Sequence, residues 1–469
     1  MSPSVPTDPP ATPSAPAVVP PRTPWGILLT ELADAAREHG DVARFRRGWL
    51  FTHPDAVRDI LVTQDRSFTK SPALRRARFT LGNGLLTNEG PTYRKQRGLI
   101  QPSLHPKRLG GYAGVIGRHA AEAAGGWRDG QTIELHREMM RLTLRIVAEA
   151  LFGSPIGPEV DALSAAMDIN VAMFRRMASP WGWLKVLAPT PTNVRFLFAH
   201  RRLVGTLRSF VRQRRAEPAG TPHDDLLARL LAARDGDGAG AAPADGGMTE
   251  RQLIDECVTL FAAGHETTAN AMTFTLWLLA QHPAVADRLA AEVDRVVPVG
   301  RLPTMDDLDA LPYARAVVAE SMRLYPPAWI MGRQAKEPVT VAGQPLPKGA
   351  VVFVSQWVTH RDARWWPDAE RFDPDRFIAE WGQPGENGAG DGRGGDGDTP
   401  SRPRWAYFPF GGGSRVCVGE AFAWAEATIA LAVIARRWRG EWADPGPMPL
   451  DPSITLRPGR EIHLTMRRR

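Results

Sequence analysis

Cysteine is scarce in this sequence. Among 469 residues only Cys257 and Cys417 occur, far apart and in unlike settings. Two such cysteines provide neither a disulfide framework nor a CxxC pair for structural zinc, so a disulfide-stapled secreted domain is excluded. This cysteine usage predicts a cytoplasmic protein.

Long apolar runs without charged residues are also missing. The stretch LIDECVTLFAAGHETTANAMTFTLWLLAQHP contains Asp255, Glu256 and Glu266, whereas a membrane-spanning helix needs about 20 predominantly apolar residues. The first residues lack a basic region followed by an apolar core, which a secretory signal requires. We therefore expect no membrane insertion.

Proline, alanine and glycine mark segments that we expect to lie outside the packed core. Residues 1–24 are rich in Pro and Ala and predict a disordered tail, followed by one large domain over residues 25–469. Within this domain, Gly/Asp-rich segments predict flexible loops at about residues 234–247 and 383–403.

Glycine motifs that bind nucleotides are absent as well. There is no GxGxxG between a strand and a helix and no GxxxxGK[ST], which excludes a nucleotide or flavin held by those motifs. The formal charge of +7 and the pI near 9.8 fit an acidic partner, an anionic substrate or merely a basic proteome, and charge alone does not choose among them. We expect no nucleic acid as a partner.

Helix-forming sequence dominates what is present. Short β-branched or aromatic runs flanked by turn residues, in GDVARFRRGWLFTHP and VTVAGQPLPKGAVVFVS, predict strands and a hairpin. Most other segments have helical patterns, so the predicted fold class is mainly α with small β-sheets (α+β). The longest predicted helix starts after Thr249, which has capping-box spacing to Gln252, and ends near His282, before Pro283.

The middle of this long helix, FAAGHETTAN, is unusual. A glycine inside a helix costs about 1 kcal/mol, and β-branched hydroxyl residues are also poor choices there. Ala263 and Thr267 are spaced i, i+4 and share one face, and Gly264 beside them is expected to let a ligand approach the backbone. The pattern indicates a functional groove in the helix.

Cys417 lies between three glycines and an amphipathic helix, in WAYFPFGGGSRVCVGEAFAWAEATIALAVIARRW. The glycines permit close approach, and the start of the following helix is expected to favour the thiolate. With Phe410 and Arg415 nearby, the loop suits a flat, anionic cofactor that contains a metal. Heme fits this description, and an axial thiolate favours cleavage of the O–O bond.

Four motifs in order resemble those of the cytochrome P-450 family, of the soluble bacterial type of heme-thiolate monooxygenase. They are FPFGGGSRVCVG, AGHETT, ESMR and ERFDPDRF, and the resemblance covers nearly everything from about Trp25 to the C-terminus. It implies the cytochrome P-450 fold, a single helix-rich domain with a long central oxygen-activating helix, and heme b as the cofactor. Cys417 takes the position of the iron ligand, and Glu266 and Thr267 take the acid and alcohol positions for proton delivery.

The resemblance also assigns roles around the cofactor. Tyr93 occupies a position where the family usually has Trp or His, and its hydroxyl is expected to donate to a heme propionate. The other predicted cofactor contacts are Arg97, Arg333, Arg415, Phe410, Gly411, Ala263 and Gly264. Glu320, Arg323 and Arg376 are expected to form a buried charge triad with a structural role.

The substrate is expected to be a small and largely apolar organic molecule. The implied reaction inserts one oxygen atom of O2, in a hydroxylation or related oxidation of a secondary metabolite such as a terpene, polyketide or peptide. The predicted pocket residues are apolar: Phe79, Leu85, Met173, Phe174, Phe261, Ala262, Trp329, Ile330 and Ile454.

Electrons are expected from an external ferredoxin and ferredoxin reductase acting on a monomer. Basic residues at Arg94, Lys95, Lys107 and Arg108 suit an acidic ferredoxin, although an ordinary solvated helix face explains them equally well. Two rival functions stay open: a peroxide-driven enzyme of the same fold, and a heme sensor without oxidative activity. The Glu266 and Thr267 pair favours the monooxygenase over both.

Overall fold

The computed structural model describes residues 26–469 except 155, 158, 179–188, 219–220, 222, 224, 236–247, 382–401 and 445. The predicted tail over residues 1–24 and most of the two predicted flexible loops lie outside the described residues. Arg402, at the end of the second predicted loop, is described, and its guanidinium carbon lies 3.5 Å from the centre of the Trp366 ring.

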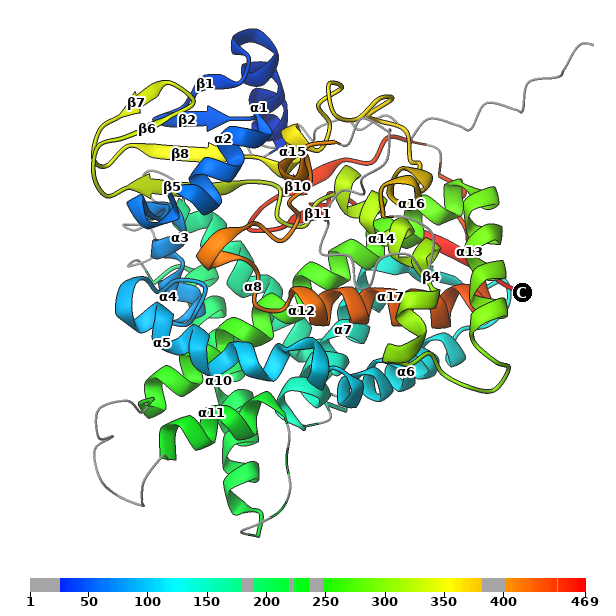
Figure 1. Cartoon of the computed structure of the whole chain (residues 1–469). Coiled ribbons are helices and arrows are strands. Elements are labelled where there is room, and N and C mark those ends of the chain that lie inside the picture. The colour runs from blue at the N-terminus through cyan, green and yellow to red at the C-terminus, as the bar shows by residue number, and fades with distance from the viewer. Residues whose placement is uncertain are drawn as a thin grey trace, which may run out of the picture.

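Helices form most of the molecule, as the sequence predicts (Figure 1). The helices of the first half are α1 Gly26–His39, α2 Pro54–Arg58, α3 Pro72–Arg76, α4 Arg78–Leu81, α5 Gly90–Ile100, α6 Gly110–Gly125, α7 Leu135–Phe152, α8 Val160–Ala178 and α10 Pro191–Ala216. Those of the second half are α11 Leu226–Asp235, α12 Glu250–Gln281, α13 Pro283–Val296, α14 Pro312–Leu324, α15 Gln356–Thr359, α16 Asp375–Trp381 and α17 Glu420–Arg437.

Four small sheets complete the fold, which confirms the predicted α+β class. The largest has the strand order β1 Val42–Phe45, β2 Gly48–Phe51, β8 Val351–Val354, β5 Met331–Ala335 and β3 Phe68–Lys70. Only its β2–β8 pair is parallel. The others are β4 Thr132–Glu134 with β12 His463–Arg468 and β9 Trp438–Glu441, then β6 Val339–Val341 with β7 Gln344–Leu346, and β10 Leu450–Pro452 with β11 Leu456–Pro458.

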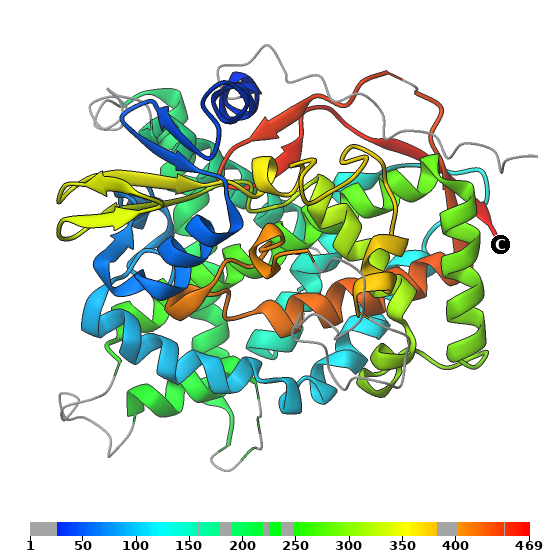
Figure 2. The ribbon, with the colours of Figure 1, turned by 45° about the horizontal axis from the view of Figure 1, so that its top comes forward.

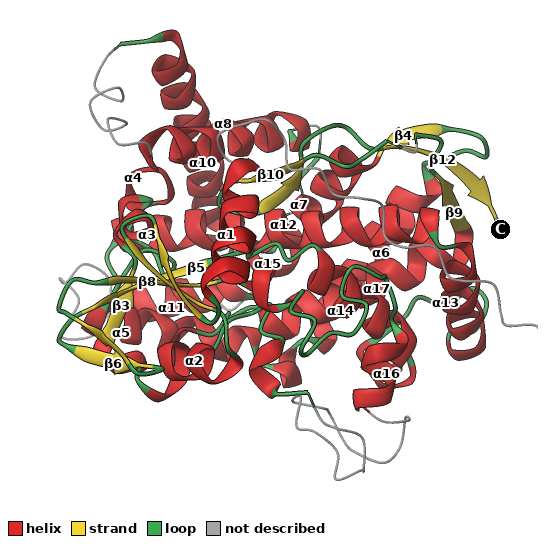
Figure 3. Ribbon diagram, turned by 90° about the horizontal axis from the view of Figure 1, so that it is seen from above, coloured by secondary structure: helices red, strands yellow, loops and turns green. Residues whose placement is uncertain are grey.

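The five-stranded sheet and the C-terminal sheet lie at opposite ends of the helical body. Figure 2 shows the strands of the large sheet projecting from one side, and in Figure 3 β4, β9 and β12 lie at the other side, near the C-terminus. Between them α12 crosses the middle of the molecule, with α7 and α17 packed against it. A ligand site beside α12 is therefore central.

Helix α12 begins and ends where the sequence predicts. Thr249 accepts a hydrogen bond from the Gln252 N–H at 3.2 Å, and the Gln252 side chain accepts from the Thr249 N–H at 2.9 Å, which completes the capping box. The helix stops at His282, before Pro283. Because other helices surround it, α12 is buried along most of its length.

Candidate active site

The Cys417 loop joins a short turn, residues 413–415, to α17. The Cys417 N–H donates to the Phe410 carbonyl at 3.0 Å, which closes the loop around the cysteine. Cys417 as a residue has accessible surface, yet burial raises the pKa of its thiol to about 11, and the hydrogen bond from the Gly419 N–H lowers this pKa less. The Gly419 N–H at the start of the helix favours the thiolate, as expected, but burial opposes it more strongly, so a thiolate here needs a cation such as a metal ion.

The loop glycines serve packing within the protein. Gly411 and Gly413 have φ angles of +74° and +65°, which side chains rarely adopt. A Cβ on Gly413 would lie 1.9 Å from the Leu61 carbonyl oxygen, and one on Gly412 would lie 2.5 Å from the Trp405 ring. The close approach that the sequence analysis assigned to a cofactor is thus required by the contact with residues 59–63 and by Trp405.

Helix α12 has accessible surface at only one stretch of its central part. Ala263 is exposed and Gly264 and Thr267 are partly exposed, whereas residues 261, 262, 265, 266 and 268 are buried. The Thr267 hydroxyl donates to the Ala263 carbonyl at 2.8 Å. This back-bonding is the arrangement expected for a threonine that opens a local groove in a helix.

Gly264 has a packing role besides the one expected. A Cβ at this position would lie 3.1 Å from Cγ2 of Val147 on α7. The missing side chain therefore faces α7, and it allows the two helices to approach closely. Gly264 is also partly exposed beside Ala263, and its predicted contact with a ligand stays a prediction.

Tyr93 and Arg97 on α5, two of the predicted cofactor contacts, form hydrogen bonds to the Cys417 loop. The Tyr93 hydroxyl donates to the Ser414 carbonyl at 2.9 Å, and Arg97 Nη1 donates to the Val416 carbonyl at 2.8 Å and to the Tyr93 hydroxyl at 3.1 Å. Because Tyr93 already donates to the chain, its predicted bond to a propionate would require this hydroxyl to change partner.

Arg415 is also engaged by the protein. Its guanidinium forms an ion pair with Glu89, 3.0 Å from Nη2, and donates to the carbonyls of Asp65 and Phe68. These bonds orient Arg415 at the junction of the Cys417 loop and β3. A propionate there would share the guanidinium with Glu89.

Arg333 and Lys70 form a pair of like charges. They lie directly opposite each other in the β5–β3 register and are both buried, and like charges in such positions are destabilising. Arg333 has one hydrogen bond, to the Gly332 carbonyl, and burial lowers its pKa to about 10. Burial likewise lowers the pKa of Lys70 to about 7, although its ammonium donates to the carbonyls of Leu85 and Asn88.

This cationic cluster, made of Lys70, Arg97, Arg333 and Arg415, is accompanied by Glu89, which forms an ion pair with Arg415 and lies near Lys70 and Arg333. Positive charge buried in excess of negative charge is costly, so the site is complete only with an anion. A cofactor with carboxylates at one edge and a metal over Cys417 fits these residues. Lys70 belongs to no sequence motif, and only the strand register shows that it lies opposite Arg333 in this cluster.

The second predicted catalytic residue, Glu266, lies away from Thr267. Arg457 on β11 forms an ion pair with Glu266 at 2.8 Å, and the Thr455 hydroxyl donates to the same carboxylate. Neighbouring residues on a helix point about 100° apart, so the two side chains do not share a face. The sequence analysis missed Arg457, which lies 191 positions away.

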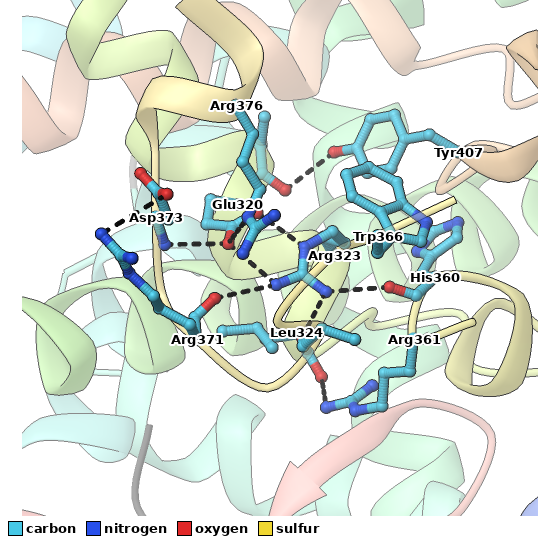
Figure 4. Close-up of polar contacts among 12 residues, drawn as sticks. Glu320, Arg323, Leu324, His360, Arg361, Trp366, Arg371, Asp373, Arg376 and Tyr407 are labelled. Carbon is cyan, nitrogen blue, oxygen red and sulfur yellow. Dashed lines mark hydrogen bonds and ion pairs between the residues drawn. The ribbon is translucent and has the colours of Figure 1, made fainter. Parts of the chain in front are cut away.

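The predicted charge triad gathers on Glu320, toward which Arg323 and Arg376 point (Figure 4). Arg323 donates to both carboxylate oxygens of Glu320 at 2.7 and 2.8 Å, and both side chains are fully buried. Arg376 lies 3.4 Å from Glu320 and donates to the Pro367 and Asp368 carbonyls. Further Arg323 donors reach the carbonyls of His360, Ala369 and Arg371.

The structure disperses the predicted substrate residues. Phe261 is fully buried against Phe152 on α7, and Met173 is 1% exposed, so neither has surface for a ligand. Phe79 is 51% exposed and stacks on Phe196 at the outside. Leu85, Ala262 and Trp329 are buried, and Ile330 and Ile454 are partly buried. The side chain of Phe174 lies outside the described residues.

A helix-rich fold with an accessible cysteine in a closed loop and a largely buried cationic cluster fits a protein that holds a metal-containing anionic cofactor. The family model described as Cytochrome P450 matches residues 16–465. The chain belongs to the cytochrome P450 family, which confirms the resemblance, and this family implies a heme-iron cofactor.

Similar proteins with named functions support membership in this family. A cyclooctat-9-en-7-ol 5-monooxygenase of Streptomyces melanosporofaciens is 34% identical over 86% of this chain and 83% of its own. Cyclooctatin synthase of the same organism is 35% identical over 91% and 87%. Pentalenene oxygenase of Streptomyces avermitilis is 33% identical over 90% and 87%. The chain is a cytochrome P450 monooxygenase, and none of its described helices is long and apolar enough to cross a membrane.

Arg333 provides a test of the cationic cluster. In Arg333→Met, heme release is expected to be about tenfold faster, because a charge-assisted hydrogen bond is worth about 1.5–3 kcal/mol. The apoprotein is expected to become more stable, because a buried guanidinium facing Lys70 is removed. Heme transfer to an acceptor protein and urea unfolding of apoprotein measure the two effects. Slower heme release would contradict the assignment, and the exposed Arg46→Met is the control.

Proposed function

We propose that this chain inserts one oxygen atom of O2 into a small, largely apolar secondary metabolite, with electrons from an external ferredoxin and its reductase. A terpene is the favoured substrate class over a polyketide or peptide, because the named relatives include cyclooctatin synthase and pentalenene oxygenase. The observation that carries the proposal is the accessible residue Cys417 in an otherwise closed loop.

Heme, when bound, supplies the iron at which O2 is reduced and a C–H bond of the substrate is oxidised. Cys417 would hold the iron, and its sulfur accepts a hydrogen bond from the Gly419 N–H that tunes electron donation. Lys70, Arg97, Arg333 and Arg415 would hold the carboxylates, for which guanidinium forks are well shaped. We propose heme b, because Cys257 is fully buried in α12 and leaves no second cysteine for covalent attachment.

Thr267 would pass the protons that the reduction of O2 requires. Its hydroxyl hydrogen is committed to the Ala263 carbonyl at 2.8 Å, so its oxygen is left to accept a hydrogen bond in the accessible stretch of α12. A donor bound there can pass a proton through the hydroxyl. Glu266 is the acid that we propose to supply protons to this position.

Apolar side chains would exclude water and hold the substrate. Trp329 donates its indole N–H to the Ser453 carbonyl at 3.1 Å, which leaves only its apolar surface unpaired. Leu85, Ala262, Ile330 and Ile454 are the remaining predicted pocket residues that keep some accessible surface. Such a lining favours hydrocarbon over polar ligands.

An acidic ferredoxin is the proposed electron donor. Arg94 and Lys95 are exposed on α5, the helix whose Tyr93 and Arg97 bind the Cys417 loop. Complementary charge at this face would steer the partner to the cofactor. We also propose that the enzyme works as a monomer in the cytoplasm.

The testing experiment compares electron sources and a Thr267 variant. With ferredoxin, its reductase and a panel of cyclic terpenes, the holoenzyme is expected to form a monohydroxylated product. In Thr267→Ala, product per oxygen consumed should fall by about tenfold or more, since proton delivery contributes at least 10²-fold. Thr273→Ala, a buried back-bonded threonine on the same helix, is the control. Peroxide-supported turnover above ferredoxin-supported turnover would contradict the proposal.

A further inference from the structure

Four segments of the chain line a cleft on the side of the molecule where the chain ends (Figure 1). We call it the C-terminal cleft. Its lining residues lie within 121–129, 293–303, 432–438 and 468–469, in or directly after α6, α13, α17 and β12. Its volume of about 680 Å³ falls within the usual range for small-molecule sites, about 300–1,000 Å³.

The C-terminal cleft is separate from the candidate active site. Cys417 precedes the first residue of α17, whereas Arg437, which lines the cleft, is the last residue of this helix. A helix rises about 1.5 Å per residue, so the two ends of α17 are about 25 Å apart. Among the described residues, no predicted cofactor or pocket residue lines the cleft. A ligand there would therefore be distinct from heme and from the substrate.

Part of the lining is apolar. Trp127 and Trp438 pack edge to face, with their ring centres 6.3 Å apart. Both indole N–H groups already donate within the protein, at 3.2 and 2.7 Å, so the rings offer only apolar surface to the cleft. In the segment after α13, Val299 is 95% exposed and Leu302 is 37% exposed. Exposed apolar side chains beside a cleft favour a ligand with a hydrocarbon part.

The rest of the lining carries an excess of positive charge. The arginines that line the cleft are Arg128, Arg301, Arg436, Arg437, Arg468 and Arg469. Asp129 is the only acid that the described part of the chain contributes to the lining. One oxygen of this carboxylate already accepts the backbone N–H of Arg468 at 2.8 Å. A ligand that carries negative charge would therefore complement the cleft.

Three of these arginines are neutralised by acids outside the lining. Arg301 donates to both carboxylate oxygens of Asp307, each at 2.7 Å. Arg436 and Arg469 share Asp294, at 3.8 and 3.2 Å. These three guanidinium groups need no further anion.

The other three, Arg128, Arg437 and Arg468, are exposed, and their side chains have no ion pair or hydrogen bond among the described residues. Arg437 nevertheless lies against the protein, because a Cβ on Gly125 at the end of α6 would be 3.6 Å from its Nη1. The negative end of α17 explains an arginine at its last residue. It explains neither Arg128, which follows α6, nor Arg468 on β12.

We propose that the C-terminal cleft binds a small amphiphilic anion, in which a carboxylate or phosphate group is carried on a hydrocarbon body. Arg128, Arg437 and Arg468 would bind the charged group, for which guanidinium forks are well shaped. Val299 and Leu302 would contact the hydrocarbon. Fatty acids and alkyl phosphates share this chemistry. The proposal does not depend on the proposed monooxygenase function.

The first test measures binding of dodecanoate and dodecyl phosphate to the holoenzyme by calorimetry. Dodecanol and inorganic phosphate serve as probes of the hydrocarbon and of the charged group alone. At least one amphiphilic anion is expected to bind about tenfold or more tightly than either partial probe, and the better of the two identifies the charged group. Equal affinity for dodecanol, or for inorganic phosphate as an adventitious ion only, overturns the proposal.

A second test locates the bound probe, because dodecanoate can also enter an apolar active site. Dodecanoate with a photoreactive diazirine at the end of its chain is irradiated on the holoenzyme, and the labelled peptides are identified by mass spectrometry. Label is expected within residues 293–303 or 121–129, without a change in the heme absorption spectrum. Label confined to other segments overturns the proposal.

Variants then test the individual contacts. Arg437→Gln and Arg468→Gln should each weaken dodecanoate binding by about tenfold or more, since each removes a hydrogen bond to a charged group. Val299→Asp should weaken it as well by placing a like charge beside the hydrocarbon. Because these side chains are exposed, the variants are expected to fold.

Arg467→Gln is the matched control. Successive side chains of a strand point to opposite faces, and Arg467 pairs with Glu441 outside the cleft. Its substitution should leave dodecanoate affinity unchanged. Unchanged affinity in Arg437→Gln/Arg468→Gln overturns the proposal. Failure of the proposed function would appear separately, as a holoenzyme that forms no product but still binds dodecanoate in the C-terminal cleft.

Discussion

Replacing Cys417 with His is expected to abolish monooxygenase turnover and the strongly red-shifted Soret band of the reduced, carbon monoxide-bound protein. Burial raises the pKa of the thiol to about 11, so a thiolate here would depend on a bound metal, which in the proposed function this sulfur holds. A histidine ligand donates less electron density and favours other heme chemistry. The absorption spectrum and product analysis of freshly purified, heme-replete protein measure both effects.

Cys257→Ala is the matched control for this experiment. Cys257 is fully buried in α12, and burial raises the pKa of its thiol above the ordinary range. The Cys257→Ala variant should keep the red-shifted band, and its free energy of unfolding should fall somewhat because the substitution leaves a cavity. A wild type without the band, or a Cys417→His variant that retains it, would show that Cys417 is not the iron ligand.

Replacing Arg323 with Met is expected to destabilise the protein by about 3–5 kcal/mol, because it leaves the Glu320 carboxylate buried with less compensation. Both side chains are 0% exposed, and Arg323 also satisfies the carbonyls of His360, Ala369 and Arg371. A loss of this size is a large fraction of the stability of a typical domain, about 5–15 kcal/mol. Equilibrium urea unfolding of the apoprotein measures it.

Two further variants identify the cause of this loss. Arg376→Gln should cost less, since its side chain is 12% exposed and its Nε lies 3.4 Å from Glu320. Glu320→Met/Arg323→Met should be more stable than Arg323→Met alone, because no buried charge is left without a partner. A destabilisation below about 1 kcal/mol in Arg323→Met, the size of an exposed ion pair, would contradict the assignment.

Local sequence determined the elements that carry the chemistry. The capping box at Thr249 and Gln252 and the proline after His282 set the bounds of α12, because helix ends depend on neighbouring side chains and backbone groups. The loop around Cys417 could likewise be predicted from contiguous residues. The mainly α class with small sheets followed from the same local patterns.

The sequence explained the glycines less well. Gly264 was expected to let a ligand approach the backbone, and the three loop glycines were expected to permit close approaches; the missing side chains of Gly264 and Gly413 face Val147 and the Leu61 carbonyl. Those partners lie far away along the chain, so no local pattern names them. Phe261 and Met173 were expected in the pocket, but packing against distant parts of the chain buries them completely or nearly so. Local sequence does not show this packing either.

By itself, then, the sequence determined the fold class and predicted the roles of Cys417, Glu266 and Thr267, since each of these depends on residues within one or two turns. Tertiary structure alone decided which charges meet. It places Lys70 opposite Arg333 through strand register and Arg457 on Glu266 across 191 positions. Buried charges are stable only with partners, and those partners are chosen where distant elements pack, which no single stretch of sequence records.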